Sequence, residues 1–442
     1  MIRRIEIILT IVLMCLTGYL AYDLFERVRT DRDLIRQETP YVEYALSDFK
    51  GELPAAYDSR EAGRKPFVKD QGALGTCWAV AASSALETYF LPEEQYIFSA
   101  DHISLQNSFA GNQRDGGGYG MLMAYLTAWQ GPVLEEDDPY GDGVSRDDLL
   151  PVKHVQEIQS LKEKDYTAIK RAVYEYGAVQ SSIYMDLKDT YSSSVYYNQL
   201  EYSYYYNGEE KSNHDVLIIG WDDYYFADRF NAKARRNGAF ICQNSWGSEF
   251  GDDGVFYISY EDVNIGNNCI VYTGVEEPDN YDRIYQTDLC GQTGVLGYGD
   301  GECYFSNIYT SNGSEDLEAV GFYALGKNTE YEIFVIKDWE NMNAFAKQKP
   351  LQKGIIEQQG YYTVKLAEAV LLEAGERYAV VVRVNTPDCI HPVAMEYVAG
   401  ETTKTVDISD GEGYISHSGV IWERVEEKHA CNICLKAYTK YR

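Results

Sequence analysis

One cysteine stands at the start of a run of small and apolar residues that predicts a helix over residues 77–90. The run opens at Cys77, directly after a segment containing Gly72 and Gly75, and Pro92 follows its end. A thiol attacks a carbonyl group as its thiolate, and a helix N-terminus stabilises that anion through free N–H groups and the positive end of the dipole. The position therefore suits a nucleophile, although a small buried cysteine explains the local sequence equally well.

A nucleophilic thiol needs a base that another part of the chain supplies. Of the six histidines, His214 opens the apolar run 215–221, and the end of a strand above a cleft is a rigid place for a general base. Asn244, within Gln-Asn-Ser-Trp-Gly, offers an amide oxygen to the imidazole, and Trp246 would shield that hydrogen bond from water. Taken singly, these residues are an ordinary surface histidine and an ordinary turn.

The elements that must position these residues change in type along the chain. Apolar patterns and their stop signals predict helices first and short strands later, which indicates an α+β domain over residues 53–275. The helices are expected at 77–90, 120–129 and 165–177, and the strands at 215–221, 238–246 and 254–260. Beyond 276–282, short apolar runs alternate with Gly, Asn and charged turns, which predicts an all-β sandwich over 280–442.

The N-terminus predicts a route out of the cytoplasm. Arg3 and Arg4 precede an apolar run over 7–22, so residues 1–22 are expected to form a membrane helix that acts as a signal anchor, with a cleaved signal peptide as the alternative. Residues 23–52 are charged and are expected to form a stalk or a short pro-region. The rest of the chain would then lie outside the cytoplasm, where disulfides are permitted.

Charge and cysteine content restrict the other classes of function. The net charge of −30 argues against nucleic-acid binding, which needs a basic surface. Nine cysteines leave at least one unpaired. Cys431 and Cys434 form an isolated C-x-x-C, so a zinc site is not expected, and a partner among Cys290, Cys303 and Cys389 is more plausible than a mutual bridge.

The motifs together resemble those of the papain-like cysteine peptidases. The matching run is Leu74-Gly75-Thr76-Cys77-Trp78, Gln71 stands six positions before the nucleophile, and His214 and Asn244 follow in the family's order and at its approximate distances. The likeness spans about residues 53–275 and includes the glycine-rich stretch 116–121.

The resemblance implies a role for each matching residue. Cys77 would be the nucleophile, His214 its proton partner and Asn244 the group that orients His214, while Gln71 and the N–H of Cys77 would stabilise the oxyanion. No metal or organic cofactor is implied. Residues on the substrate side would be Gly75, Gly117, Gly118 and Trp246. Secreted members of the family often carry two bridged cysteines, one three positions before the nucleophile and one just before the glycine-rich stretch. This chain has Leu74 and Asp115 at those two positions.

A bacterial subgroup with a C-terminal lectin-like β-sandwich is the best match, since in that subgroup a Tyr-rich segment, here 196–208, precedes the histidine. This segment is expected either to line the cleft or to pack on the sandwich. The expected function is an extracytoplasmic cysteine endopeptidase acting on protein or peptide substrates, with a possible glycan or surface ligand for the C-terminal domain. The alternatives are a transpeptidase or isopeptidase, and a surface-binding protein with an inactive scaffold.

Overall fold

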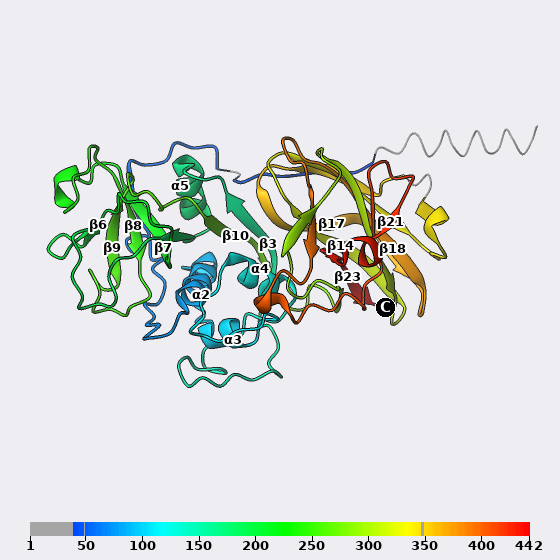
Figure 1. The fold of residues 1–442 in the computed structure, drawn as a ribbon, viewed down its shortest axis with the longest axis horizontal. Helices are drawn as coiled ribbons and strands as arrows, with labels where there is room; N and C mark the ends of the chain where they lie inside the picture. Colours follow the sequence, from blue (N-terminus) through cyan, green and yellow to red (C-terminus); the bar gives the residue numbers. More distant parts are fainter. Residues whose placement is uncertain (1–38, 48, 346–348) are drawn as a thin grey trace, which may run out of the picture. The chain divides into compact units, whose positions relative to one another are not determined.

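A computed structural model describes residues 39–47, 49–345 and 349–442 (Figure 1). The membrane helix expected over 7–22 lies outside these residues. Within the described part of the chain, no helix is long and apolar enough to cross a membrane. Residues 42–442 form one unit, which contains both the papain-like part and the β-sandwich.

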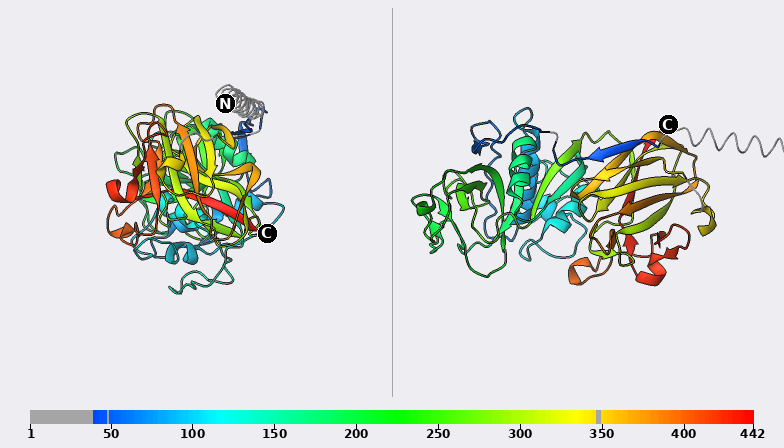
Figure 2. Two further views of the ribbon diagram at one scale, coloured as in Figure 1. Left: turned by 90° about the vertical axis from the view of Figure 1, so that its right-hand side faces the viewer. Right: turned by 90° about the horizontal axis from the view of Figure 1, so that it is seen from above.

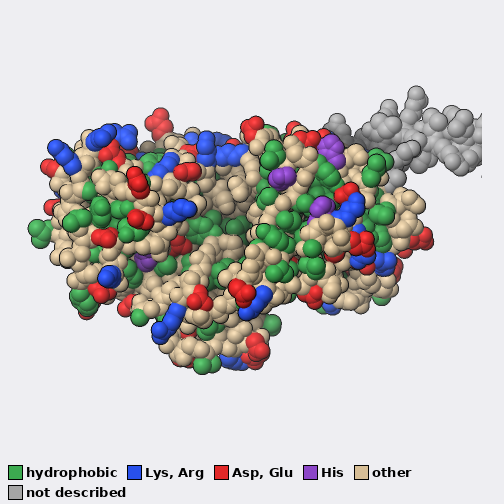
Figure 3. Space-filling view, viewed as in Figure 1, with side chains coloured by type: hydrophobic (Ala, Val, Ile, Leu, Met, Phe, Trp, Pro, Cys, Tyr) green, Lys and Arg blue, Asp and Glu red, His purple; other side chains and the backbone are tan. Residues whose placement is uncertain are grey.

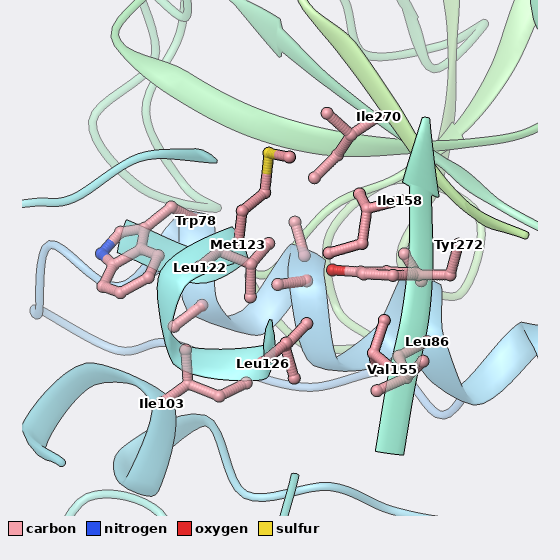
Figure 4. Packing of buried hydrophobic residues seen from close by; sticks show 14 of the residues in the cluster. Trp78, Leu86, Ile103, Leu122, Met123, Leu126, Val155, Ile158, Ile270 and Tyr272 are labelled. Carbon is pink, nitrogen blue, oxygen red and sulfur yellow. The ribbon is translucent and has the colours of Figure 1, made fainter. Parts of the chain in front are cut away.

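The helical half of the papain-like part is built around α2 (Cys77–Phe90), which confirms the helix expected over 77–90. The other expected helices are α4 (Tyr119–Thr127) and α5 (Tyr166–Glu175), while the short α3 (Ala100–Leu105) was not predicted. Residues 78–88 of α2 are all buried, because the helix is surrounded by packing partners rather than half-exposed. Trp78 and Leu86 of α2 meet Leu122 and Leu126 of α4 in this core (Figure 4).

The strand half carries the expected strands β7 (His214–Asp222), β8 (Ala239–Gln243) and β9 (Val255–Ser259) as antiparallel neighbours. Tyr-rich residues 196–208 form a small hairpin of β5 (Tyr197–Asn198) and β6 (Ser203–Tyr204), and β6 pairs with β9. Tyr204 and Tyr206 are buried in the core of this half. The segment is therefore a hairpin, but its buried tyrosines pack inside the strand half, neither along a cleft nor on the sandwich as the two alternatives expected.

The C-terminal part is the expected all-β sandwich (Figure 2). Its seven-stranded sheet has the order β1 (Tyr41–Tyr44), β16 (Gln352–Ile356), β15 (Thr329–Ile336), β18 (Arg377–Asn385), β13 (Glu302–Thr310), β20 (Gly413–Ser416) and β21 (Glu423–Arg424). A three-stranded sheet consists of β12 (Gly294–Leu296), β19 (Val393–Glu396) and β22 (Asn432–Ile433). Short helical turns complete this part at η2 (Met342–Phe345), η3 (Glu401–Thr403) and α6 (Val425–His429), and η1 (Ala227–Arg229) lies in the peptidase.

One sheet of 13 strands runs through both parts of the chain, which the sequence did not predict. Its order is β11 (Arg283–Tyr285), β23 (Leu435–Tyr441), β14 (Glu315–Ala324), β17 (Gln359–Leu372), β3 (His154–Leu161), β10 (Cys269–Glu276), β4 (Val179–Ile183), β7, β8, β9, β6 and β5, with β2 (Ala56–Asp58) paired to β7. The join is antiparallel, with Gln359 opposite Ser160 and Tyr362 opposite Glu157. Because main-chain hydrogen bonds cross from β17 to β3, the sandwich continues the sheet of the α+β part.

Charged side chains of both signs are spread over the face seen in Figure 3, where no large patch of one sign is visible. The net charge of −30 is therefore not gathered on this face.

Within the segment expected to be a stalk, the side chain of Leu46 is 7% exposed and joins the core of the strand half.

Candidate active site

Helix α2 begins at Cys77 without a side-chain cap. Thr76 occupies the N-cap position, but its hydroxyl bonds to the Tyr140 hydroxyl instead of to the helix. The first turn also contains no acidic residue. The free N–H groups of this turn therefore keep their hydrogen-bonding capacity and their positive field for an anion at the Cys77 position.

His214 lies at the first residue of β7 and contacts Asn244, which follows β8. His214 Nε2 and Asn244 Oδ1 are 2.7 Å apart, and the backbone N–H of Ser245 donates to the same oxygen at 2.8 Å. Because Oδ1 can only accept, Nε2 carries the proton and Nδ1 keeps its lone pair. The Trp246 ring lies 5.1 Å from the imidazole, centroid to centroid, and covers this contact.

Cys77 and His214 both line one hollow of about 390 Å³ at the meeting of the helical and strand halves. Its opposite wall is the glycine-rich stretch that includes Gly117 and Gly118, and Trp78 and Asp215 complete the lining near the thiol. The backbone of Asp215 is within hydrogen-bonding reach of the Cys77 sulfur. The fold therefore brings the residues singled out at positions 77 and 214 to one cleft.

Gln71 is not among the residues that line this hollow, and contacts on both ends of its amide fix it beside Leu74 and Ser245. The Ser245 hydroxyl donates to its Oε1, and its Nε2 donates to the Leu74 carbonyl at 2.7 Å. Its backbone is held as well, by the Ser245 carbonyl at 2.8 Å and by the Tyr140 hydroxyl at 2.9 Å. One N–H of the amide remains for another acceptor, since an amide nitrogen carries two protons.

Burial disfavours each charge of the site when it is taken alone. Burial raises the pKa of the Cys77 thiol to about 11, with a smaller contribution from the negative charge of Asp215. Burial lowers the pKa of His214 to about 4, against the opposing effect of its hydrogen bond to Asn244. A negative charge on Cys77 and a positive charge on His214 would each offset the cost of burying the other.

The glycines expected on the substrate side have different surroundings. A Cβ at Gly75 would lie 3.1 Å from the carbonyl oxygens of Gln113 and Arg114, so this glycine permits close backbone packing. A Cβ at Gly117 would lie 2.2 Å from the Trp78 ring, whereas one at Gly118 would meet no atom within 4 Å. Of the three glycines, only Gly118 therefore has free space on the side where a Cβ would lie, and this side is called its open face.

Hydrogen bonds, and no disulfide between described residues, tie the loop carrying these glycines to the turn before Cys77. The N–H of Gly75 donates to the Gln113 carbonyl at 2.8 Å, and Gln113 Nε2 donates to Ser104 at 2.9 Å. The eight cysteines in the described ranges are all free, so the partner expected for Cys431 or Cys434 is not found. Both side chains are buried as small apolar groups, Cys431 in the core of the sandwich and Cys434 in the core around α2.

Sequence reasoning did not single out Ser245, Tyr140 or Asp215. Ser245 stands inside the Asn-Ser-Trp motif, so its position beside Asn244 was a usable signal. Tyr140 comes from a distant loop, and no spacing in the sequence connects it to Gln71.

For metals, no cluster of three or more His, Cys, Asp or Glu side chains suited to an ion occurs among the residues that the structure describes.

The fold and the cleft together define a two-part peptidase architecture in which a thiol stands at a helix N-terminus and an Asn-bound imidazole on the facing sheet. Residues 53–277 match the papain family cysteine protease, and residues 284–439 match the lectin like domain. The chain belongs to the papain family of cysteine proteases, which places it among the cysteine peptidases.

Known structures resemble both parts of the chain at once. The structure of the clostridial cysteine protease Cwp84 after propeptide cleavage has a TM-score of 0.77 and 27% identity, and the match covers 88% of this chain and 99% of that one. The cysteine protease and lectin-like domains of Cwp84, described as a surface layer associated protein of Clostridium difficile, share the fold with a TM-score of 0.75 and 24% identity over 94% of this chain and 96% of that one.

Curated relatives match the peptidase part. Cathepsin K of Mus musculus is 27% identical over 218 residues, which is 47% of this chain, and cathepsin K of Gallus gallus is 29% identical over 219 residues. The chain spans about 60% of the length of each of these relatives.

Proposed function

We propose that the protein is an extracytoplasmic cysteine endopeptidase that hydrolyses peptide bonds through Cys77, His214, Asn244 and Gln71. The observation that carries the proposal is the 2.7 Å contact between His214 Nε2 and Asn244 Oδ1 in a cleft that Cys77 also lines. This contact leaves Nδ1 as the proton acceptor for the thiol.

The steps follow from the positions of these groups. The thiol proton passes to His214 Nδ1 as the sulfur attacks the peptide carbonyl, and the new C–S bond gives a tetrahedral oxyanion. The free N–H of the Gln71 amide and the backbone N–H of Cys77 donate to that oxyanion. His214 then protonates the departing amine, and a water molecule attacks the thioester, returns a proton through His214 and releases the carboxylate.

The substrate side is proposed to include Gly75, Gly117, Gly118 and Trp246. Gly118 is the member whose open face suits an extended substrate backbone. Gly75 and Gly117 would act by keeping the wall of the cleft close to α2, and Trp246 would keep water from the bond between His214 and Asn244.

The domain limits proposed are 53–275 for the peptidase and 280–442 for the lectin-like sandwich, with protein or peptide substrates for the first and a glycan or surface ligand for the second. A location outside the cytoplasm is supported by the likeness to a protein described as surface layer associated. A membrane anchor over 1–22 or a cleaved signal peptide would each provide that location. Residues 23–52 would then serve as stalk or short pro-region, with the end of this segment held on the folded unit by β1 and Leu46.

Active-site labelling combined with proteolysis tests the mechanism. Iodoacetamide should label Cys77 faster than any of the buried cysteines, His214→Ala should slow the labelling, and Cys77→Ala should abolish cleavage of an unfolded protein. Mass spectrometry of the products separates the alternatives, since a free carboxylate indicates hydrolysis and a new amide with an added amine indicates transpeptidation. Slow labelling shared among cysteines, with no cleavage, would refute the proposal and favour a binding protein.

A further inference from the structure

A buried carboxylate faces the same cleft and takes no part in the proposed proton transfer. Asp215 follows His214 on β7, lines the hollow with Cys77, and is only 8% exposed. Gln180 Nε2 donates to one of its carboxylate oxygens at 2.9 Å, and the Ser182 hydroxyl donates to the other at 2.7 Å. The side chain is therefore held in place by neutral groups.

Asp215 lacks the cation that two other buried acids of this protein have. Glu87 pairs with Lys69 at 2.6 Å, and Asp288 pairs with Lys436 at 2.8 Å. Among the described residues, no lysine or arginine forms an ion pair with Asp215. Asp101 and Glu396 are likewise buried with neutral donors only, but of these three carboxylates only Asp215 lines the cleft. Burying a carboxylate without a cation is costly, and neutral donors compensate only part of that cost.

The surroundings of Asp215 leave room for a cation from outside the chain. An ionised carboxylate has about four acceptor positions. Gln180 and Ser182 occupy two of them, and the Tyr119 hydroxyl also interacts with this carboxylate. The Tyr119 side chain lines the same part of the hollow, and its hydroxyl lies 2.8 Å from Ser182 Oγ, so a ring stands ready to cover an alkyl stem. The Arg114 side chain that borders the hollow belongs to the glycine-rich wall and is exposed.

We propose that Asp215 is a specificity-determining residue that binds a lysine or arginine side chain of the substrate within two residues of the scissile bond. The inference rests on the proposed function, because it assigns a substrate class to the same cleft. An ammonium or guanidinium group would supply the cation that Asp215 lacks, and the methylene stem would pack on Tyr119.

The same contact would also assist the nucleophile. The negative charge of Asp215 contributes to raising the pKa of Cys77. A bound substrate cation neutralises that charge at close range, which favours the thiolate when a substrate with the right side chain is present. The cationic residue should therefore raise kcat as well as lower KM.

Two measurements test the inference separately from the proposed function. The first is binding of paired peptides, identical except for lysine or norleucine near the expected cleavage point, to the Cys77→Ala protein by calorimetry, which needs no turnover. The second is the ratio of kcat/KM for the two peptides with protein that retains Cys77. In both, the lysine peptide should be favoured by about 10- to 100-fold, because a hydrogen-bonded charge pair contributes about that much discrimination.

Asp215→Asn should remove this preference, while the control Asp115→Asn, which neutralises an exposed acid on the opposite wall, should retain it. Thermal unfolding shows whether Asp215→Asn is folded, and Ser182→Ala, which keeps the charge but loses one donor, should keep most of the preference. Cleavage without any lysine or arginine preference, or a preference that survives in Asp215→Asn, overturns the inference alone. Selective binding without hydrolysis overturns the proposed function alone, and the absence of both overturns the two together.

Discussion

Replacing Asn244 with alanine should cost activity through the orientation of His214, in addition to the stability lost with a buried hydrogen bond. The substitution removes the acceptor that lies 2.7 Å from His214 Nε2 and 2.8 Å from the backbone nitrogen of Ser245, so two buried N–H groups lose this partner. An unsatisfied buried donor costs about 1–3 kcal/mol, so a loss concentrated in the transition state lowers kcat/KM by about 5- to 150-fold. The same bond raises the pKa of His214, so its loss should lower that pKa further.

The pH profile separates this effect from a general loss of structure. The base must be neutral to take the thiol proton, so activity should be lost as the pH falls through the pKa of His214, which burial lowers to about 4. In Asn244→Ala, the acid limb of the kcat/KM profile should move to still lower pH while its plateau falls. The measurement is hydrolysis of a fluorogenic peptide at a series of pH values.

A second asparagine–histidine pair provides a matched control. Asn280 Oδ1 lies 2.6 Å from His154 Nδ1, and this pair is not among the residues that line the cleft. Asn280→Ala should lower the melting temperature by an amount comparable to that of Asn244→Ala, with kcat/KM and its acid limb unchanged. The reasoning is refuted if Asn244→Ala retains the kcat/KM and acid limb of the unmodified protein, or if Asn280→Ala reproduces the loss.

Three further changes test other parts of the structure. Gly117→Ala should lower the free energy of unfolding by about 1–3 kcal/mol in denaturant, because its Cβ would overlap the Trp78 ring. Gly118→Ala should leave the free energy of unfolding unchanged and raise KM. Equal effects of the two variants on both measures would contradict the assignment of the open face to Gly118. Gly360→Ala should lower the melting temperature, because its Cβ would lie 2.1 Å from the Ile158 carbonyl oxygen where β17 pairs with β3. An unchanged melting temperature would argue against a continuous sheet. Reducing agent should leave the melting temperature unchanged, since the cysteines of the described ranges are free, and a drop would reveal a disulfide.

The sequence predicted what depends on local pattern. The helix over 77–90 was predicted to the residue because small apolar side chains and a following proline mark both of its ends. The strands at 214–222 and 255–259 were predicted from short apolar runs between turns. The meeting of positions 77, 214 and 244 was expected from the family resemblance rather than from any property of the separate segments.

What the sequence could not predict depends on contacts between distant segments. β3 and β17 are separated by about 200 positions, and neither carries a signal that names the other as its partner. The fixation of Gln71 by Ser245 and Tyr140 is likewise a product of the folded chain. The same holds for Asp215, because its sequence position beside a histidine does not reveal that it is buried without a cation.

The continuous sheet bears on the role of the lectin-like part. A hollow of about 550 Å³ adjoins the cleft, shares Tyr119 and Asn268 with it, and is also lined by Lys327 and Asp388 of the sandwich. The Ala110 N–H, on the loop that leads to the glycine-rich wall, donates to the Thr402 carbonyl of the sandwich at 2.8 Å. The sandwich therefore extends the peptidase's sheet, supports the loop that leads to the glycine-rich wall and lines the neighbouring hollow, so it is part of the scaffold around the cleft.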